Sequence, residues 1–201
     1  MNVHVHTGSI TDAAIGAHAV VNASNPAVAL GSGVSAAIRE ACGGTAFQKE
    51  VRARLEGEFD AELEPEDCLV TSAGTCTAFR WVLHVPAVNY RVRDTETGGS
   101  TGPRRVATCM SAALSEARSL AAENDLTGRF VLAAPLLGAG HGGLGAVTSL
   151  DAMLSGAQQH LKQLSPEAWS TLAKLVVVVL EPSDARLVEL AAARHGVRFE
   201  R

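Results

Sequence analysis

Short aliphatic runs alternate with longer amphipathic stretches along the whole chain. The aliphatic runs predict strands near residues 3–5, 18–21, 68–70, 81–83, 129–132, 174–180 and 197–199. The run at 174–180 is apolar at almost every position, which is typical of a strand that is covered on both faces. The hydrophobic pattern therefore predicts a sheet whose centre is shielded from water on both sides.

The amphipathic stretches between these runs predict five helices. Apolar residues recur every three or four positions in residues 34–42, 45–57, 103–124, 148–164 and 183–196. Gly43 and Gly196 are glycine stop signals at two of the helix ends. We expect capping boxes at 45–48 and 148–151, and Ser183 as the cap of the last helix.

Strands that alternate with helices predict an α/β protein with helices on both faces of one sheet. The length of 201 residues suits one domain spanning residues 1–201. Residues 91–105 (RVRDTETGGSTGPRR) are the one stretch that looks like a linker. This stretch is too short to divide two domains, and we interpret it as an exposed, mobile loop.

The charge and the composition of the chain argue against one class of partner and indicate the kind of core. Lys and Arg number 17 against 21 Asp and Glu, and the net charge is −4. A protein that grips nucleic-acid phosphates is expected to be basic, so nucleic acid is not an expected partner. The chain has 19 glycines but only 4% aromatic residues. The core must therefore be aliphatic, and the glycines must serve turns or close approach of the backbone.

The cysteines and the N-terminus bear on metal binding and compartment. The four cysteines, at positions 42, 68, 76 and 109, lack C-x-x-C spacing. We interpret them as buried, reduced thiols and expect neither a metal nor a cofactor. The first residues lack the basic and apolar segments of a signal peptide, and the longest apolar run is too short to span a bilayer. A cytoplasmic protein without membrane contact is the expectation.

The first glycine-rich loop, residues 22–34, joins a predicted strand to a predicted helix. Such a junction presents free backbone N–H groups and the positive end of a helix dipole, which together favour an anion. Asn22 and Asn25 stand at its entrance, and their amides can donate to and accept from ribose hydroxyls. A simple turn with a glycine bend explains the same residues and stays open as an alternative.

The second glycine-rich loop, residues 135–145, also follows a strand and precedes a helix. Its glycines at 138, 140 and 143 match G-x-G-x-x-G. A Rossmann fingerprint needs a strand and an acid about 20 residues further on. The next predicted strand ends at roughly twice that distance, so this interpretation is disfavoured. Two such loops at strand ends suit a ligand with a diphosphate in its middle.

Four motifs in register resemble the macrodomain family. Residues 20–25 (VVNASN), 31–38 (GSGVSAAI) and 42–43 (CG) resemble its V-N-A-A-N, G-G-G-V-x-x-A-I and A-x-G signature. Residues 135–140 (PLLGAG) resemble its second loop. Residues 7–11 (TGSIT) take the place of G-D-I-T, and residues 81–86 (WVLHVP) resemble its I-H-x-V-x-P strand. The resemblance implies a three-layer α/β/α fold around a mixed, mostly parallel sheet of six or seven strands.

The resemblance also implies that ADP-ribose or an ADP-ribosylated protein is the partner. Asn25 matches the asparagine that contacts the distal ribose, and Asn22 matches the one that shapes the loop. Ser9 and Ile10 match the pair that reads adenine. The implied ligand-binding residues are Ser9, Ile10, Asn22, Asn25, Gly31, Ser32, Gly33, Val34, Gly138, Ala139, Gly140, His141 and Gly142.

Several positions depart from the family pattern. Ser9 stands where the family has Asp, and a hydroxyl accepts a hydrogen bond more weakly than a carboxylate. Gly142 stands where an aromatic usually lies against the distal ribose, and Ser35 where one hydrolytic branch has Asp. We expect an ADP-ribosylhydrolase without the usual catalytic Asp, with Asn25 and His141 as candidate catalytic residues. A non-catalytic reader of ADP-ribose is the alternative.

Overall fold

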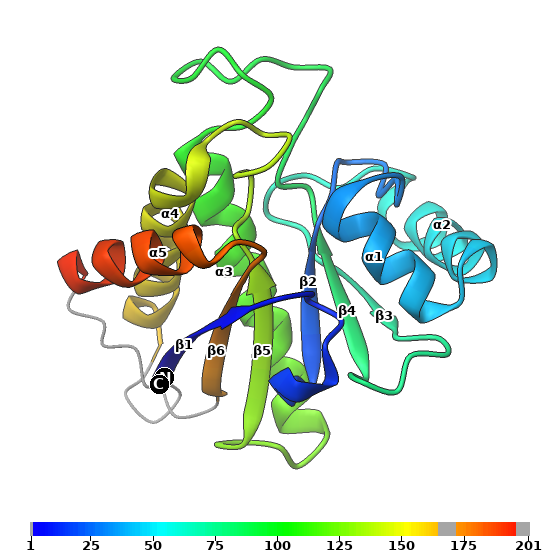
Figure 1. The fold of residues 1–201 in the computed structure, drawn as a ribbon. Coiled ribbons are helices and arrows are strands. Elements are labelled where there is room, and N and C mark those ends of the chain that lie inside the picture. The colour runs from blue at the N-terminus through cyan, green and yellow to red at the C-terminus, as the bar shows by residue number, and fades with distance from the viewer. Residues whose placement is uncertain (1, 165–171, 196–201) are drawn as a thin grey trace.

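Six strands and five α-helices make up the described part of the chain (Figure 1). The computed structural model describes residues 2–164 and 172–195. The strands are β1 (Asn2–Thr7), β2 (Ala19–Ala23), β3 (Leu69–Ser72), β4 (Trp81–Val85), β5 (Phe130–Pro135) and β6 (Leu172–Val179). The helices are α1 (Gly33–Cys42), α2 (Thr45–Phe59), α3 (Pro103–Glu123), α4 (Gly145–Lys162) and α5 (Pro182–Arg194), and a short 3₁₀ helix spans Ala13–Ile15. The strand predicted at 197–199 and the stop at Gly196 lie outside the described residues.

The strands form one mixed, mostly parallel sheet in the order β1-β6-β5-β2-β4-β3. Only β3 runs antiparallel to its neighbour, β4. Side chains alternate across the sheet, so Leu175 and Val177 of β6 pack with α3, α4 and α5, whereas Val176 and Val178 pack toward α1 and α2. Figure 1 shows these two helical layers on opposite sides of the sheet. The predicted three-layer fold is confirmed.

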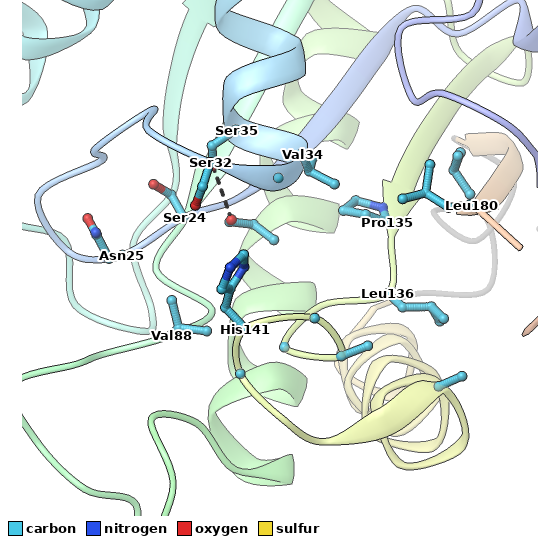
Figure 2. Close-up of a pocket in the computed structure, with 18 of the residues that line it drawn as sticks. Ser24, Asn25, Ser32, Val34, Ser35, Val88, Pro135, Leu136, His141 and Leu180 are labelled. Carbon is cyan, nitrogen blue, oxygen red and sulfur yellow. Dashed lines mark hydrogen bonds between the residues drawn. The ribbon is translucent and has the colours of Figure 1, made fainter.

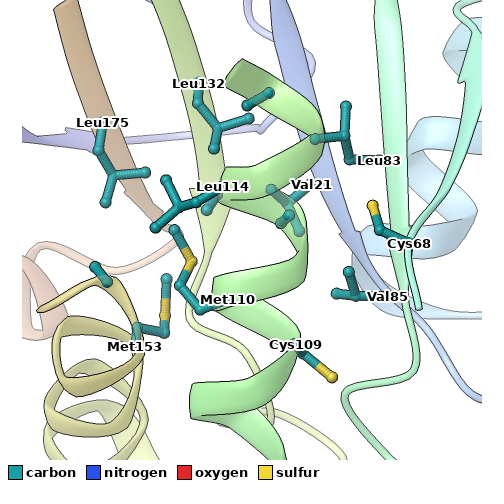
Figure 3. Close-up of a cluster of buried hydrophobic side chains, with 14 of the residues drawn as sticks. Val21, Cys68, Leu83, Val85, Cys109, Met110, Leu114, Leu132, Met153 and Leu175 are labelled. Carbon is teal, nitrogen blue, oxygen red and sulfur yellow. The ribbon is translucent and has the colours of Figure 1, made fainter. Parts of the chain in front are cut away.

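The core is aliphatic, as the composition predicts. One cluster between the sheet and α3 includes Met110, Leu114, Leu132 and Met153 (Figure 3). All four cysteines are free thiols, and only Cys76 is not fully buried. Within residues 2–164 and 172–195, no helix has both the length and the apolar character needed to cross a bilayer.

The predicted helix caps are wrong, and the first of them is the box at 45–48. Gly44 precedes α2 without a side-chain cap. Gln48 instead accepts from the backbone N–H of Leu30 at 3.0 Å and donates to the carbonyl of Val28 at 3.4 Å. Its amide thus holds the first glycine-rich loop in place from α2.

The helices α4 and α5 also begin without the predicted caps. Helix α4 begins at Gly145, three residues before the predicted start, and neither it nor α5 has a side-chain cap. Ser149, inside the predicted 148–151 box, donates to the carbonyl of Leu137 at 2.8 Å. Ser183 is already a helical residue of α5, because the cap position falls on Glu181. Both helices therefore begin before the residues that the local patterns predict as caps.

The loop predicted at 91–105 is shorter and more ordered than its composition suggests. Its last residues belong to α3, and Thr101 is fully buried. Asp94 organises the exposed part, because its backbone N–H donates to Gly99 at 2.9 Å and its carboxylate accepts from the N–H groups of Glu96 and Thr97, both at 3.0 Å. These hydrogen bonds hold the pKa of Asp94 below its usual value.

A buried chain of hydrogen bonds connects β3, β4, β2 and α1. Ser35 donates to Asn22 Oδ1 at 2.7 Å, and Asn22 Nδ2 donates to His84 Nδ1 at 2.9 Å. Nε2 of His84 lies 3.0 Å from Thr71 Oγ1. Since Nδ1 accepts, the proton of the imidazole is on Nε2 and points at Thr71. Burial lowers the pKa of His84 to about 3, so the ring stays neutral.

Helices α3 and α4 approach each other closely at Gly156. A Cβ atom at this position would lie 2.2 Å from the carbonyl oxygen of Ala107 in α3. Gly57, in α2, has nothing within 4 Å of the corresponding position. The first glycine is therefore required by packing and the second is not.

We expect Gly156→Ala to lower the free energy of unfolding by about 2 kcal/mol, because the methyl group must push α4 away from α3. The control Gly57→Ala is expected to raise it by up to about 1 kcal/mol through helix propensity. Urea denaturation of both variants measures these changes. A Gly156→Ala protein as stable as wild type would contradict the close packing of the two helices.

We expect His84 to make the folded protein sensitive to acid. The pKa of His84 falls from 6.5 in the unfolded chain to about 3 in the fold. The unfolded state therefore binds the extra proton between these values, and stability decreases as the pH falls through that window. Wild type should lose about 1.4 kcal/mol per pH unit more than His84→Gln between about pH 6 and pH 4.

Chemical denaturation across this pH range gives the two slopes. Parallel slopes for the two proteins would contradict the assignment. If His84→Gln does not fold, ¹⁵N NMR of the wild-type imidazole tests the same point. The expected spectrum is that of a neutral ring protonated on Nε2 at pH 5, and a cationic ring would contradict it.

Candidate functional site

A cavity of about 540 Å³ lies where β2, β5 and β6 end, between the two glycine-rich loops (Figure 2). Ala23, Pro135 and Val179 are the last residues of these three neighbouring strands, and all three line the cavity. The carboxyl ends of parallel strands are the usual place for a ligand in an open α/β sheet. The sequence prediction of one crevice shared by two loops is thus confirmed in its geometry.

Most of the predicted ligand-binding residues line this pocket, and four do not. The residues in the wall are Asn25, Ser32, Gly33, Val34, Gly138, Ala139, Gly140, His141 and Gly142. Those not in the wall are Ser9, Ile10, Asn22 and Gly31. Asn22 is fully buried in the hydrogen-bond chain beneath the loop, and Ile10 is buried in the core beside α1 and α2. Ser9 is exposed, with its hydroxyl 2.8 Å from that of Thr11.

Two helix N-termini face the pocket without side-chain caps. Ser32 precedes α1 and Leu144 precedes α4, and neither side chain accepts from a helical N–H. The first N–H groups of a helix have no partner inside the helix. Gly33, Val34 and Ser35 of α1 and Gly145 and Ala146 of α4 all line the pocket. Both positive helix ends therefore act on the same cavity, which favours a negatively charged ligand.

The described wall residues offer a negatively charged ligand few charged partners. None of the described residues that line the pocket is Lys or Arg. Asp184, from the first turn of α5, contributes a carboxylate, and His141 contributes an imidazole. An anion in this pocket accordingly depends on main-chain N–H groups, on helix dipoles and on side-chain donors other than Lys and Arg.

The two predicted catalytic residues lie on opposite loops. Asn25 Oδ1 accepts from the N–H of Ala29 at 3.2 Å, and none of the described residues accepts from its Nδ2. His141 is exposed, and Figure 2 shows its ring pointing from the second loop toward Ser24 and Ser32 of the first. Both side chains therefore have a polar group available to a ligand, and no described carboxylate stands next to them in the wall.

The pocket has a polar end and an apolar end. Ser24, Asn25 and His141 lie toward one side in Figure 2, whereas Pro135 and Leu180 lie toward the other. Leu180 is 73% exposed although it is a large apolar residue, so a flat apolar group would find a surface there. The two ends suit the two halves of a ligand that differs in polarity along its length.

Several wall residues were not among the predicted ones. Ser24, Val88, Tyr90 and Asp184 line the pocket. Val88 and Tyr90 follow the carboxyl end of β4, and the rule that ligands sit at strand ends would have found them. Asp184 comes from α5, which is distant in sequence from both glycine-rich loops, so no local pattern indicates it.

The absence of an aromatic residue at position 142 has a steric reason. A Cβ atom on Gly142 would lie 2.4 Å from the carbonyl oxygen of Gly138 and 2.7 Å from Cγ2 of Thr101. Any side chain at this position would therefore distort the second loop. The packing of the second loop against Thr101 therefore requires glycine at position 142.

Comparisons with known proteins agree with this architecture. The family model for the Macro domain matches residues 21–153, which is more than half of the chain. A mutant Oceanobacillus iheyensis macrodomain with ADPR is 19% identical, covers 95% of this chain and 91% of that chain, and superposes with a TM-score of 0.71.

A second macrodomain structure gives the same result from another organism. The Trypanosoma brucei macrodomain in complex with ADP-ribose is 18% identical, with 95% of this chain and 69% of that chain covered and a TM-score of 0.66. A search of curated proteins found no match. The strand order, the two loops at the strand ends and the match of the family model lead to one conclusion: this chain belongs to the macrodomain family.

Proposed function

We propose that the pocket between the two glycine-rich loops binds ADP-ribose. The observation that carries this proposal is the pair of helix N-termini without side-chain caps that face one cavity. A diphosphate between them would accept hydrogen bonds from the N–H groups of both helices. Structures similar in fold support the ligand class, because their descriptions include ADPR, ADP and ADP-ribose.

The two ends of the pocket orient the ligand in this proposal. Adenine lies at the apolar end against Pro135 and Leu180, where Asp184 is the carboxylate that accepts from its amino group. The distal ribose lies at the polar end, where Asn25 Nδ2 can donate to a ribose hydroxyl. The diphosphate then falls between the N-termini of α1 and α4.

We further propose that the protein hydrolyses mono-ADP-ribosyl linkages. Water attacks the anomeric carbon of the distal ribose, the bond to the acceptor group breaks, and the acceptor leaves with a proton. Asn25 orients the ribose, and His141 is the one histidine among the described wall residues and the candidate for proton transfer there. The released products are ADP-ribose and the unmodified acceptor.

A specific observation favours a second candidate, a non-catalytic reader. The residues that mark the polar end, Ser24, Asn25 and His141, include neither Asp nor Glu. The one carboxylate among the described wall residues, Asp184, is in the first turn of α5, four residues after Leu180 of the apolar end. A carboxylate base typically contributes roughly 10²–10⁴-fold to such a reaction. Hydrolysis here would have to proceed through positioning and His141, whereas binding needs neither.

We expect ADP-ribose to bind with a heat signal in isothermal titration calorimetry, and Gly140→Val to abolish it. Gly140 lines the pocket and has nothing within 4 Å of its Cβ position, so the valine enters the cavity without disturbing the fold. Gly57→Val is the matched control, because its position is equally open but lies on α2. Equal binding by both variants would place the ligand elsewhere, and no binding by wild type at millimolar ADP-ribose would refute the proposed function.

We expect wild-type protein to release ADP-ribose from a mono-ADP-ribosylated protein carrying ester or arginine linkages. Asn25→Ala should reduce this release by at least about tenfold, because the ribose loses its orientation. Mass spectrometry of the modified protein and chromatography of the product measure the rate. If wild type binds ADP-ribose but releases none from either linkage, the reader is the correct function and the hydrolase proposal fails.

A further inference from the structure

Tyr90 is the one Phe, Tyr or Trp among the described residues that line the pocket. It is also the single tyrosine of the chain. Its side chain is 61% exposed, which is unusual for an aromatic residue in a protein with so few of them. An exposed ring beside a polar pocket is a surface that is ready to be covered by a ligand.

The backbone on both sides of Tyr90 is fixed. Val88 donates to the carbonyl of Ser24 at 3.2 Å, and Asn89 donates to the carbonyl of Ser100 at 2.7 Å. On the other side, the N–H of Arg91 donates to Asn89 Oδ1 at 3.0 Å. The ring therefore projects from a held segment, so that little order has to be gained when a ligand covers it.

The segment that carries Tyr90 leaves the polar end of the pocket. Val88, two residues before it, lies near Asn25 and His141 in Figure 2, on the side away from Leu180. The hydrogen bond from Val88 to Ser24 ties the segment directly to the first glycine-rich loop. From the position of Val88 we infer that the ring of Tyr90 is nearer to the proposed distal ribose than to the adenine.

The segment that carries Tyr90 also prevents two positions of the second loop from carrying a side chain. Thr101 closes this segment, is fully buried and donates to the carbonyl of Ala87 at 2.6 Å. Its Cγ2 would collide with any Cβ on Gly142 or Gly138, at 2.7 and 3.0 Å. Gly138 and Gly142 therefore cannot be replaced by an aromatic residue without distortion, whereas Tyr90 already places an aromatic residue in the wall.

We propose that Tyr90 packs its ring against the distal ribose and thereby makes the pocket prefer ADP-ribose over ADP. This inference rests on the proposed function, since it assigns a specificity residue to the same pocket. One face of a ribose carries C–H groups, and an aromatic ring covers such a face while leaving the hydroxyls free for Asn25. ADP has no second ribose, so it cannot make this contact.

Calorimetry with two ligands and three variants tests the role of the ring. Tyr90→Ala should weaken ADP-ribose binding about three- to tenfold and leave ADP binding unchanged. Tyr90→Phe keeps the ring and should bind both ligands within about twofold of wild type. Val92→Ala is the control, because Val92 is also 61% exposed on the same segment but does not line the pocket. It should bind like wild type.

The single tyrosine gives an independent readout. In protein labelled with ¹³C-tyrosine, the ring signals should shift on addition of ADP-ribose and stay in place with ADP. A structural role for Tyr90 would not separate the two ligands in this way.

The outcomes distinguish the two levels of the proposal. If wild type binds neither ligand, the proposed function fails. If wild type binds ADP-ribose and Tyr90→Ala binds it equally well, the role of Tyr90 is overturned while the function stands. A loss in Tyr90→Phe as large as that in Tyr90→Ala also overturns it, because the hydroxyl and not the ring would then make the contact.

Discussion

The pocket depends on the hydrogen bonds around the neutral imidazole of His84. A buried polar group without a partner is costly, so Asn22 and Thr71 must each present a suitable atom to the ring. Asn22 then has one amide oxygen left, and Ser35 of α1 donates to it. This chain fixes the first turn of α1 relative to β2 and β4. The direction of the helix N-terminus at the cavity is therefore set from inside the core.

A second set of contacts fixes the loops that bound the cavity. Gln48 reaches from α2 to the backbone of the first glycine-rich loop, and Thr101 packs beneath the second. Neither side chain lines the pocket. The polar wall is made by main-chain groups that these residues hold in place. A site of this kind binds through preorganised geometry, and its supporting residues matter as much as the wall itself.

The sequence was informative where one physical pattern dominates. The aliphatic run of β6 and the glycines between strand and helix predicted the sheet and the two loops, because burial and turn geometry need those residue types. The box at 45–48 failed because Gln48 has tertiary partners that a local pattern cannot show. The caps at 148–151 and Ser183 failed because α4 and α5 begin earlier, at Gly145 and Pro182. Asn22 illustrates the same limit: its amide suits a ligand, but His84 and Ser35, distant in sequence, occupy it. Asp184 reaches the pocket only through the chain topology, whereas Tyr90 follows the end of β4 and could have been found from that strand.

The main-chain character of the polar wall has a consequence for how this protein can change over time. An amide N–H is present at every position except proline, so replacing a wall side chain leaves the donor in place as long as the turn is kept. Substitutions can therefore accumulate at the positions that line the pocket and alter its shape and selectivity. The pocket still attracts anions. A library of side-chain substitutions at the pocket would yield variants with new preferences far more readily than variants that ignore negative charge.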